Sequence, residues 1–589
     1  MMTKAINTGY LIKFPQNNYR KICLLIFVWT FFTIGLLAQG SYDLIIRNGR
    51  IIDGTGNPWF QSDIGIINGK IVSIKNLRNQ QAKREIDAKG LYVTPGFIDL
   101  HSHADRAMTS EFVEARMAKS LTSQGLTTVL GGPDGRNTTW PLNKEIDALK
   151  SKGHGMNFIL MVGHSTIRAE VMGDDYERFA TQDEIEQMRN YLREGLELGA
   201  FGMGAGLEYR PARFSNTEEL VALGEIISDY NGFYIAHQRN EAVMPLWQLP
   251  STAKGWQTDG LQSLEETIQI ARATGIRVVG SHHKSRGRSS FGRSAHDIQV
   301  INKARDEGLQ VFIDVYPYET FGGGARPMIP KWSLVNKNVS ITGGRDDPKW
   351  SEKDLFKNSR KNLRRNWSDP KKRKIIIRDI SWIVDHNGGQ DRVVVVDYPD
   401  SDFVGKTLEQ IARDKNITFQ EVVVHMALNG YKEVIGGAWT RGYGINDMDV
   451  TNYYKQDYTI TSSDAAVSGV KDKEGFKSEP GAHPRHFGAF TRRIARYVKD
   501  LDITTLPFAI RSMTGLPASV VGLKDRGYLK ENYAADITII NFQNIRDKAT
   551  ILKPDMLSEG IEYVIVNGEF TVDQGELTGN LPGVIIRNN

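Results

Sequence analysis

Two histidines stand one residue apart in the stretch GFIDLHSHAD, residues 96–105, directly after an apolar run. Side chains two positions apart on a strand point to the same face, so His101 and His103 are expected to face the same side. Neutral imidazole is the commonest nitrogen ligand for metal ions in proteins. The pair alone allows two interpretations: a polar loop that begins with two histidines, or half of a metal site.

Further potential ligands follow other short apolar runs. They are Asp134 in GGPDG, His237 in IAHQRNE, the adjacent His282 and His283 in GSHHK, and Asp464 in TSSD. Each of them could be a hydrogen-bonded structural residue. Six candidate ligands at the ends of strands, with the adjacent histidines counted as one, nevertheless indicate a divalent metal site that holds one or two ions.

The apolar runs themselves predict the fold. Eight of them, from FIDLHSH to YTITSSD, alternate with amphipathic stretches such as 182–198, 216–230 and 261–274. Alternating strands and helices imply a parallel sheet, and eight units imply an α/β (β/α)8 barrel of the TIM type. Active sites of such barrels lie at the carboxyl ends of the strands, so the candidate ligands are expected to converge there.

The two chain ends differ from this pattern. Alternating apolar and polar residues turn at Asn48-Gly49, Asn68-Gly69 and Asn567-Gly568, which is typical of hairpins. We therefore expect a small β-sandwich built from residues 41–96 and 516–589, with the barrel spanning 97–515 between them. A polar, Trp- and Lys-rich segment at about 320–390 interrupts the barrel, and with Trp332 it could form a lid. Its basic run NSRKNLRRNWSDPKKRK could bind an acidic partner, but we favour a solvated helix face.

The N-terminus predicts export. A basic stretch precedes the apolar residues 22–37, and small residues follow, so residues 1–38 are expected to be a signal peptide of a periplasmic or secreted protein without stable membrane insertion after cleavage. An uncleaved N-terminal membrane anchor is the alternative. The only cysteine, Cys23, lies in this segment, so the mature chain would have no thiolate ligand. With 74 basic and 69 acidic residues, the chain gives no indication of nucleic-acid binding, and its oligomeric state is not predicted.

A resemblance to a known family rests on longer motifs that cover nearly the whole mature chain. They are GHSTIR, GLEYRPA, SHHK, DVYPY, HPRHFGAFTRRIARYV and GLKDRGYLKENYAADITIINF. With the histidines and the final aspartate, they resemble the N-acyl-D-amino-acid deacylases (D-aminoacylases) of the amidohydrolase superfamily. The resemblance implies a metal-dependent barrel that hydrolyses N-acyl-D-amino acids, small-molecule substrates, with zinc as the expected ion and manganese or cobalt as alternatives.

The resemblance also implies roles for individual residues. Asp464 would be both a metal ligand and the catalytic acid and base. Lys284, Arg485 and Tyr316 would bind the substrate carboxylate. His164, Arg168 and Tyr209 lie on the expected rim without an assigned role. Of the adjacent histidines His282 is the expected ligand, because His283 stands where the family commonly has leucine.

One position departs from the family. The ligand after the second strand is typically a cysteine in an Asn-Cys-Gly turn, whereas this chain has Pro133-Asp134-Gly135. Because carboxylate is a harder ligand than thiolate, the number and preference of metal ions are open.

Three other functions remain as alternatives. The chain could hydrolyse cyclic amides, as dihydroorotases and hydantoinases do, although those relatives commonly carry a strand-four lysine that FGMGAG lacks. It could also act on dipeptides with a D-residue. The third alternative is a non-catalytic secreted binding protein.

Overall fold

The computed structural model of the protein describes residues 42–251, 258–322, 326–335, 358–468, 471–472, 475–476 and 482–588. The expected signal peptide lies outside the described residues, as does the part of the expected insertion between 336 and 357. Within the described ranges, no helix combines the length and the apolar character needed to cross a membrane.

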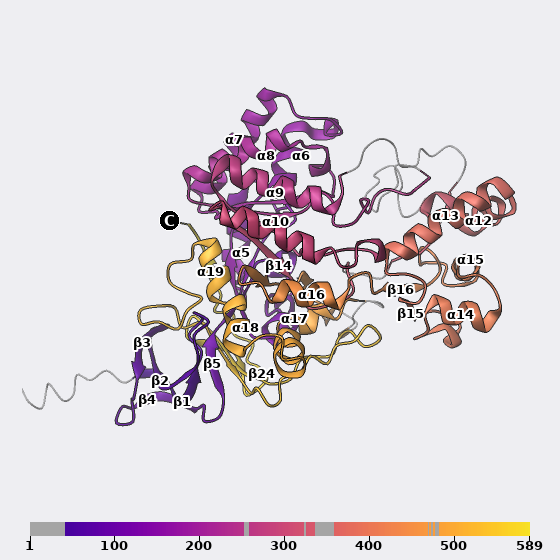
Figure 1. Cartoon of the computed structure of the whole chain (residues 1–589). Helices are drawn as coiled ribbons and strands as arrows, with labels where there is room; N and C mark the ends of the chain where they lie inside the picture. Colours follow the sequence, from indigo (N-terminus) through magenta and orange to yellow (C-terminus); the bar gives the residue numbers. More distant parts are fainter. Residues whose placement is uncertain are drawn as a thin grey trace, which may run out of the picture.

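Short parallel strands alternate with helices through the middle of the chain (Figure 1). In chain order the strands are β6 (Phe97–Asp99) and β7 (Ser102–His103), β8 (Leu126–Leu130), β9 (Asn157–Ile159) and β10 (Val162–Gly163), β11 (Gly202–Gly206), β12 (Phe233–His237), β13 (Arg277–Gly280), β14 (Val311–Val315) and β17 (Thr459–Thr461). They pair in the orders β6-β8-β9 and β10-β11-β12-β13-β14-β17. The short strand β18 (Ala465–Ala466) pairs in parallel with β7, which joins the last strand to the first. The expected (β/α)8 barrel is confirmed.

Helices connect the successive strands of the barrel and follow its last strand. They are α2 (Asp105–Met108), α3 (Val113–Arg116), α4 (Lys119–Thr122), α5 (Leu142–Lys152), α6 (His164–Met172), α7 (Gln182–Glu197), α8 (Thr217–Asp229), α9 (Gly260–Thr274), α10 (Ser294–Asp306), α16 (Asp447–Tyr454), α17 (Arg485–Ile494), α18 (Leu506–Met513) and α19 (Gly515–Val521). The three stretches expected to be helical correspond to α7, α8 and α9. Two of these helices begin with capping boxes, Thr181 with Glu184 and Asp259 with Gln262, which satisfy the free N–H groups of the first turn.

The C-terminal limit of the barrel lies later than the sequence predicts. Leu516, Val520 and Val521 of α19 share a buried cluster with Ile98 and Leu130 of the barrel. The helix therefore packs as part of the barrel, and the boundary expected after residue 515 falls at its beginning.

Strands from both chain ends form one nine-stranded sheet, which lies at one end of the molecule in Figure 1. Its members are β1 (Tyr42–Ile51), β2 (Phe60–Ile67), β3 (Lys70–Lys75), β4 (Ala82–Asp87), β5 (Tyr92–Pro95), β21 (Ile537–Ile540), β22 (Ile561–Val566), β23 (Glu569–Asp573) and β24 (Glu576–Leu577). The antiparallel pair β5–β21 joins the two halves, and isoleucines from both halves share one core.

Two of the three predicted hairpin turns are confirmed. Asn68-Gly69 and Asn567-Gly568 have positive φ at both residues and connect antiparallel strands, as a tight turn requires. The turn predicted at Asn48-Gly49 is wrong, because β1 continues through it. Asn48 there adopts a φ of 58° at a register shift between β1 and β2, so the Asn-Gly signal marks a β-bulge.

The inserted segment forms a unit with its own core beside the barrel, at the right of Figure 1. Its elements are α12 (Ser359–Ser368), α13 (Pro370–His386), β15 (Val393–Asp397), α14 (Leu408–Lys415), α15 (Phe419–Asn429) and β16 (Trp439–Gly442). The buried cluster runs from Met328 to Ala438, so the boundary expected near residue 390 falls inside it. Trp332 packs against this cluster, and its indole donates to Asp379 at 2.8 Å. The lid function stays a prediction.

Candidate active site

The six expected ligands meet at the carboxyl ends of the barrel strands. His101 lies between β6 and β7, His103 ends β7, Asp134 follows β8, His237 ends β12, His282 follows β13 and Asp464 follows β17. The fold therefore brings together side chains that lie up to 363 positions apart, as the barrel geometry predicts.

Asp134 lies in the middle of the four imidazoles. Its Oδ1 is 3.6 Å from Nε2 of His101, 3.9 Å from Nδ1 of His237 and 3.8 Å from Nε2 of His282. Its Oδ2 is 3.7 Å from Nε2 of His103. The two oxygens thus face different histidines, an arrangement in which one carboxylate can bridge two ions.

Asp464 faces the same group from the other side. Its Oδ1 lies 3.6 Å from Nε2 of His101 and 3.3 Å from Nε2 of His103, while its Oδ2 accepts from Nη1 of Arg485 at 2.5 Å. The His103 side chain is 38% exposed, so the group opens to solvent at this histidine.

The donor atoms fit a cation. Nε2 of His101 and Oδ1 of Asp134 are buried and have no hydrogen-bond partner among the described residues. Burial and the neighbouring His282 hold the pKa of His101 well below its usual range, so its imidazole is neutral and offers a lone pair. Burial alone would raise the pKa of Asp134, but the neighbouring imidazoles, His282 first, outweigh it and lower that pKa. A neutral imidazole and an ionised carboxylate are ligands for a divalent ion.

Small residues on β11 allow Asp134 to reach this position. A Cβ on Gly204 would lie 2.2 Å from the carbonyl oxygen of Gly132, and one on Gly206 would lie 2.5 Å from that of Asp134. The glycine-rich sequence of β11 therefore lets the loop after β8 pack directly against the strand. This explains why FGMGAG carries no larger side chain at these two positions.

Comparison with known proteins agrees with this geometry. A family model described as the amidohydrolase family matches residues 84–235 and 459–572. A D-aminoacylase from Alcaligenes xylosoxydans xylosoxydans is 27% identical over 567 residues, 92% of this chain and 97% of that protein. An N-acyl-D-glutamate deacylase from the same organism is 27% identical over 573 residues, 94% of this chain and 98% of that protein.

Among solved structures, one similar protein is the N-acyl-D-glutamate deacylase from Bordetella bronchiseptica, in complex with zinc and a phosphonate inhibitor. The TM-score is 0.68 at 26% identity, and the match covers 93% of this chain and 100% of the deacylase chain. A D-aminoacylase with a binuclear metal centre has a TM-score of 0.66 at 27% identity with the same coverage. The chain is therefore similar over nearly its whole length to amidohydrolases.

The D-aminoacylase and the N-acyl-D-glutamate deacylases match nearly the whole chain, and the protein is an enzyme that hydrolyses amide bonds. An L-hydantoinase from Arthrobacter aurescens, at 14% identity and a TM-score of 0.53, shares the fold.

His101 is held through its other ring nitrogen, and His282 through its backbone. Nδ1 of His101 hydrogen-bonds Ser281 Oγ, which donates to Asp314 at 2.6 Å. Asp314 also accepts from the backbone N of His282 at 2.9 Å and from Ser462 at 2.5 Å. Asp314 lies in the DVYPY motif, where sequence analysis assigned a role only to Tyr316. Hydrogen-bonded partners of this kind fix the orientation of a ligand ring.

Lys284 has a different position from the one expected. Its ammonium pairs with Glu241 and lies 2.7 Å from Nδ1 of His282, on the side of that ring that faces away from Asp134. His237, Glu241 and His282 form another group with metal-ligand spacing, but this ammonium already places a cation between two of its members. In this structure Lys284 supports His282, and its expected role in binding the substrate carboxylate stays a prediction.

Arg485 and Tyr316 are the other two residues expected to bind the substrate carboxylate. Tyr316 is 2% exposed, its hydroxyl is buried without a partner among the described residues, and its ring centre lies 4.8 Å from the guanidinium carbon of Arg485. Nε of Arg485 is likewise buried without a partner in that part of the chain. Both side chains thus keep hydrogen-bonding capacity for a ligand.

The adjacent residues His282 and His283 have different partners. His283 hydrogen-bonds Gln238 at 2.8 Å and Asp297 at 3.0 Å, so both of its ring nitrogens are engaged away from Asp134. His282 is the one that joins the ligand group.

The three residues left without a role have structural partners. His164 and Arg168 both pair with buried Glu219, and the ring of Tyr209 lies 4.4 Å from that of His237. Sequence analysis missed Glu208, Glu241 and Arg286, which lie directly behind the metal-facing histidines.

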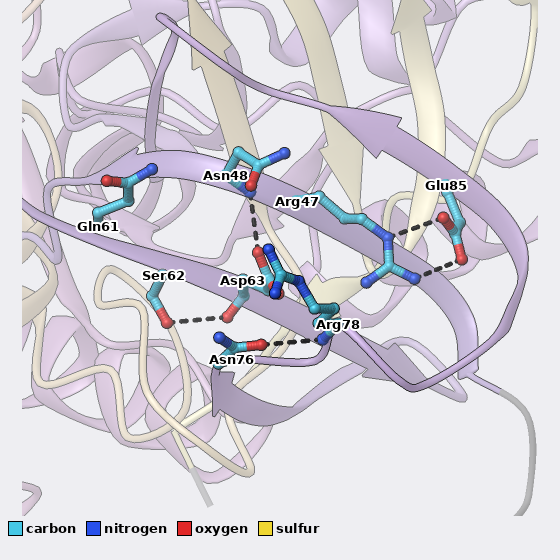
Figure 2. Close-up of a pocket in the computed structure, with 8 residues that line it drawn as sticks. All are labelled: Arg47, Asn48, Gln61, Ser62, Asp63, Asn76, Arg78 and Glu85. Atoms are coloured by element: carbon cyan, nitrogen blue, oxygen red, sulfur yellow. Dashed lines mark hydrogen bonds and ion pairs between the residues drawn. The ribbon is translucent and has the colours of Figure 1, made fainter.

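A polar hollow on the nine-stranded sheet is a separate feature (Figure 2). It is lined by Arg47, Asn48, Gln61, Ser62, Asp63, Asn76, Arg78 and Glu85. Arg47 forms two bonds to Glu85, and Asp63 accepts from the backbone of Asn48 at 2.8 Å. Arg47, Glu85, Asn48 and Asp63 thus pair within the hollow, and none of the expected ligands lines it.

Proposed function

We propose that the protein hydrolyses the amide bond of N-acyl-D-amino acids and releases a carboxylate and a D-amino acid. The observation that carries the proposal is the group of His101, His103, Asp134, His237, His282 and Asp464 at the strand ends, with Arg485 bound to Asp464. Full-length similarity to a D-aminoacylase and to deacylases for N-acyl-D-glutamate and N-acyl-D-aspartate supports this substrate class.

These six side chains would hold one or two divalent ions, with zinc as the expected metal and manganese or cobalt as alternatives. Such an ion supplies Lewis acidity toward an acyl carbonyl and toward water. The two oxygens of Asp134 face different histidines, which favours a site for two ions.

Asp464 is the proposed proton carrier. Burial alone would raise its pKa, but the charge of Arg485 and that of His282 outweigh burial and hold the pKa well below its usual range. Asp464 is therefore ionised before the reaction. Because Oδ2 is occupied by Arg485, Oδ1 is the atom that would accept the proton of the attacking water and return it to the leaving nitrogen.

Arg485 and Tyr316 would bind the free carboxylate of the amino-acid half. A guanidinium with an unused N–H and a buried phenol without a partner can both donate to a carboxylate. Their position next to Asp464 would place the scissile nitrogen, which is one carbon away from that carboxylate, close to the proton carrier.

The test is a substrate panel on metal-loaded protein. It comprises N-acyl-D- and N-acyl-L-amino acids with neutral and acidic side chains, their amidated forms, dipeptides that end in a D-residue, and hydantoins. We expect turnover of the N-acyl-D free acids, with much lower kcat/KM for the L enantiomers and the amidated forms. Hydantoin hydrolysis as the main activity, or equal rates on D and L substrates, would contradict the proposal.

A further inference from the structure

Arg286 lies behind the ligand group and joins two buried carboxylates. The side chain is 1% exposed. Its Nη2 and Nη1 donate to the two oxygens of Glu208 at 2.7 and 2.9 Å, and Nη1 also donates to Oε2 of Glu241 at 2.8 Å. Both glutamates are as deeply buried as the arginine, with 2% and 3% exposure.

Each of these glutamates contacts one metal-facing histidine. Oε2 of Glu208 lies 3.0 Å from Nε2 of His237, and Oε1 of Glu241 lies 2.8 Å from Nδ1 of His282. The carboxylate of Glu208 keeps the proton on Nε2 of His237, so Nδ1 of His237 carries the lone pair. Nδ1 of His282 lies between Oε1 of Glu241 and the ammonium of Lys284, which together hold the orientation of that ring. The opposite nitrogens, Nδ1 of His237 and Nε2 of His282, face Asp134 and lie 2.7 Å from each other.

The three charged residues come from three successive strand ends. Glu208 follows β11, Glu241 follows β12 and Arg286 follows β13, and the backbone N of Arg286 donates to the backbone O of Glu241 at 2.9 Å. A planar guanidinium can bond to several oxygens in fixed directions, whereas two buried carboxylates without it would repel each other.

We propose that Arg286 is a positioning residue of the metal centre, which fixes the ring orientation of His237 and His282, and the tautomer of His237, by holding Glu208 and Glu241. The inference rests on the metal centre of the proposed function, but it does not depend on the substrate. Arg286 itself contacts none of the ligand atoms and would act only through the two glutamates.

The same chain contains a matched control. His164, Glu219 and Arg168 form a second buried set of the same residue types, in which Glu219 accepts from both His164 and Arg168. All three side chains have 0% exposure, and none of them belongs to a group with metal-ligand spacing among the described residues. Loss of Arg168 should therefore affect folding as loss of Arg286 does, without changing the metal centre.

The experiment compares Arg286→Met with Arg168→Met. Zinc affinity is measured by competition with a chromogenic chelator, the visible absorption bands of cobalt-loaded protein report the ligand geometry, and thermal unfolding reports stability. We expect Arg286→Met to weaken zinc binding about 10- to 100-fold, the effect typical of lost support for a ligand ring, and to shift the cobalt bands. Arg168→Met should leave the zinc affinity and the cobalt bands unchanged.

Two further variants keep the test decisive if Arg286→Met does not fold. Arg286→Lys keeps the charge but cannot bond to three oxygens in the same geometry, so an intermediate loss of zinc affinity is expected. Glu208→Gln should weaken zinc binding through His237 alone. Zinc affinity within twofold of the wild type in the variants that fold, or an equal loss in Arg168→Met, would overturn the inference. A wild-type protein that binds zinc but hydrolyses no N-acyl-D-amino acid would instead contradict the proposed function.

Discussion

Asp464 combines a ligand position, a contact to a cation and an unusual backbone conformation. Its φ is 49°, in the left-handed region, where aspartate and asparagine are tolerated better than most residues. Asp464→Asn therefore keeps the backbone and removes only the charge and the proton acceptor. We expect kcat to fall at least ~10²-fold, the lower end for general acid–base catalysis. Wild-type turnover in an Asn variant with full metal content would rule out the proposed role.

Two substitutions test whether Asp134 is a metal ligand. Since its two oxygens face different histidines, Asp134→Ala should lose both metal and activity. Asp134→Cys should recover zinc binding and narrow the choice of activating metal, because thiolate is a soft ligand. Elemental analysis of the purified variants measures this. Unchanged metal content and normal activity in Asp134→Ala would leave Asp134 as a turn residue only.

Residue type and strand position sufficed to predict which side chains would meet. His101, His237 and Asp464 each follow an apolar run, and the barrel brings the carboxyl ends of these strands together. The partners of those side chains could not be predicted in the same way. Glu208 and Glu241 also follow strands, but a glutamate in a loop is ordinary, and only the packed structure shows that Arg286 joins them. For the same reason the sequence does not show that the ammonium of Lys284 pairs with Glu241.

At the scale of elements, buried ion pairs connect helices to the loops that carry ligands. Asp297 on α10 accepts from His283 in the loop after β13, from Arg293 on the preceding turn, and from Tyr453 on α16 at 2.6 Å. Burial alone would raise the pKa of Asp297, but the bond to His283 and the charge of Arg293 outweigh it and lower that pKa to about 2.

Asp297→Asn should therefore destabilise the fold by about 3–5 kcal/mol, the cost of leaving buried charges without a partner. Because the pKa of Asp297 is lowered by folding, its contribution is full above about pH 4 and is lost as the pH falls toward 2. Urea unfolding should give the same difference from the wild type at pH 7 and pH 5.

The exposed Asp306→Asn on the same helix is the control, with a change within about 0.5 kcal/mol. A cost below about 1 kcal/mol for Asp297→Asn, or one that grows between pH 7 and pH 5, would contradict this account.

Local sequence signals were least informative where an element depends on distant partners. Asn48-Gly49 has the residues of a hairpin turn, yet β4 and β5 pair with β1 on both sides of it and keep the strand continuous. The limits of the insertion depended likewise on which apolar residues share a core, since Ala438 packs with Met328 across more than a hundred positions.

At the scale of the whole molecule, the C-terminal segment connects the terminal sheet with the barrel. After the last strand of the sheet the chain returns to the barrel, where β25 (Ile585–Ile586) pairs in parallel with β9. Asn157 on β9 bonds to Asp536 and Asn567 of the sheet and to the backbone N of Val584. One buried barrel residue thus contacts three parts of the C-terminal region, which explains how residues 584–586 dock.

Gly583 tests the importance of this docking. Its backbone N donates to the carbonyl of His154 at 2.8 Å, and a Cβ at this position would lie 2.1 Å from the carbonyl oxygen of Met156, so an added methyl group forces the backbone apart. Gly583→Ala should lower the free energy of unfolding by about 1–3 kcal/mol, the usual cost of overpacking. Val584→Ala is the neighbouring control, because this side chain is 44% exposed and its docking contacts are made by the backbone. Equal stability of the two variants in urea unfolding would show that the C-terminal segment adds nothing to the barrel, and that β9 is stabilised by β8 alone.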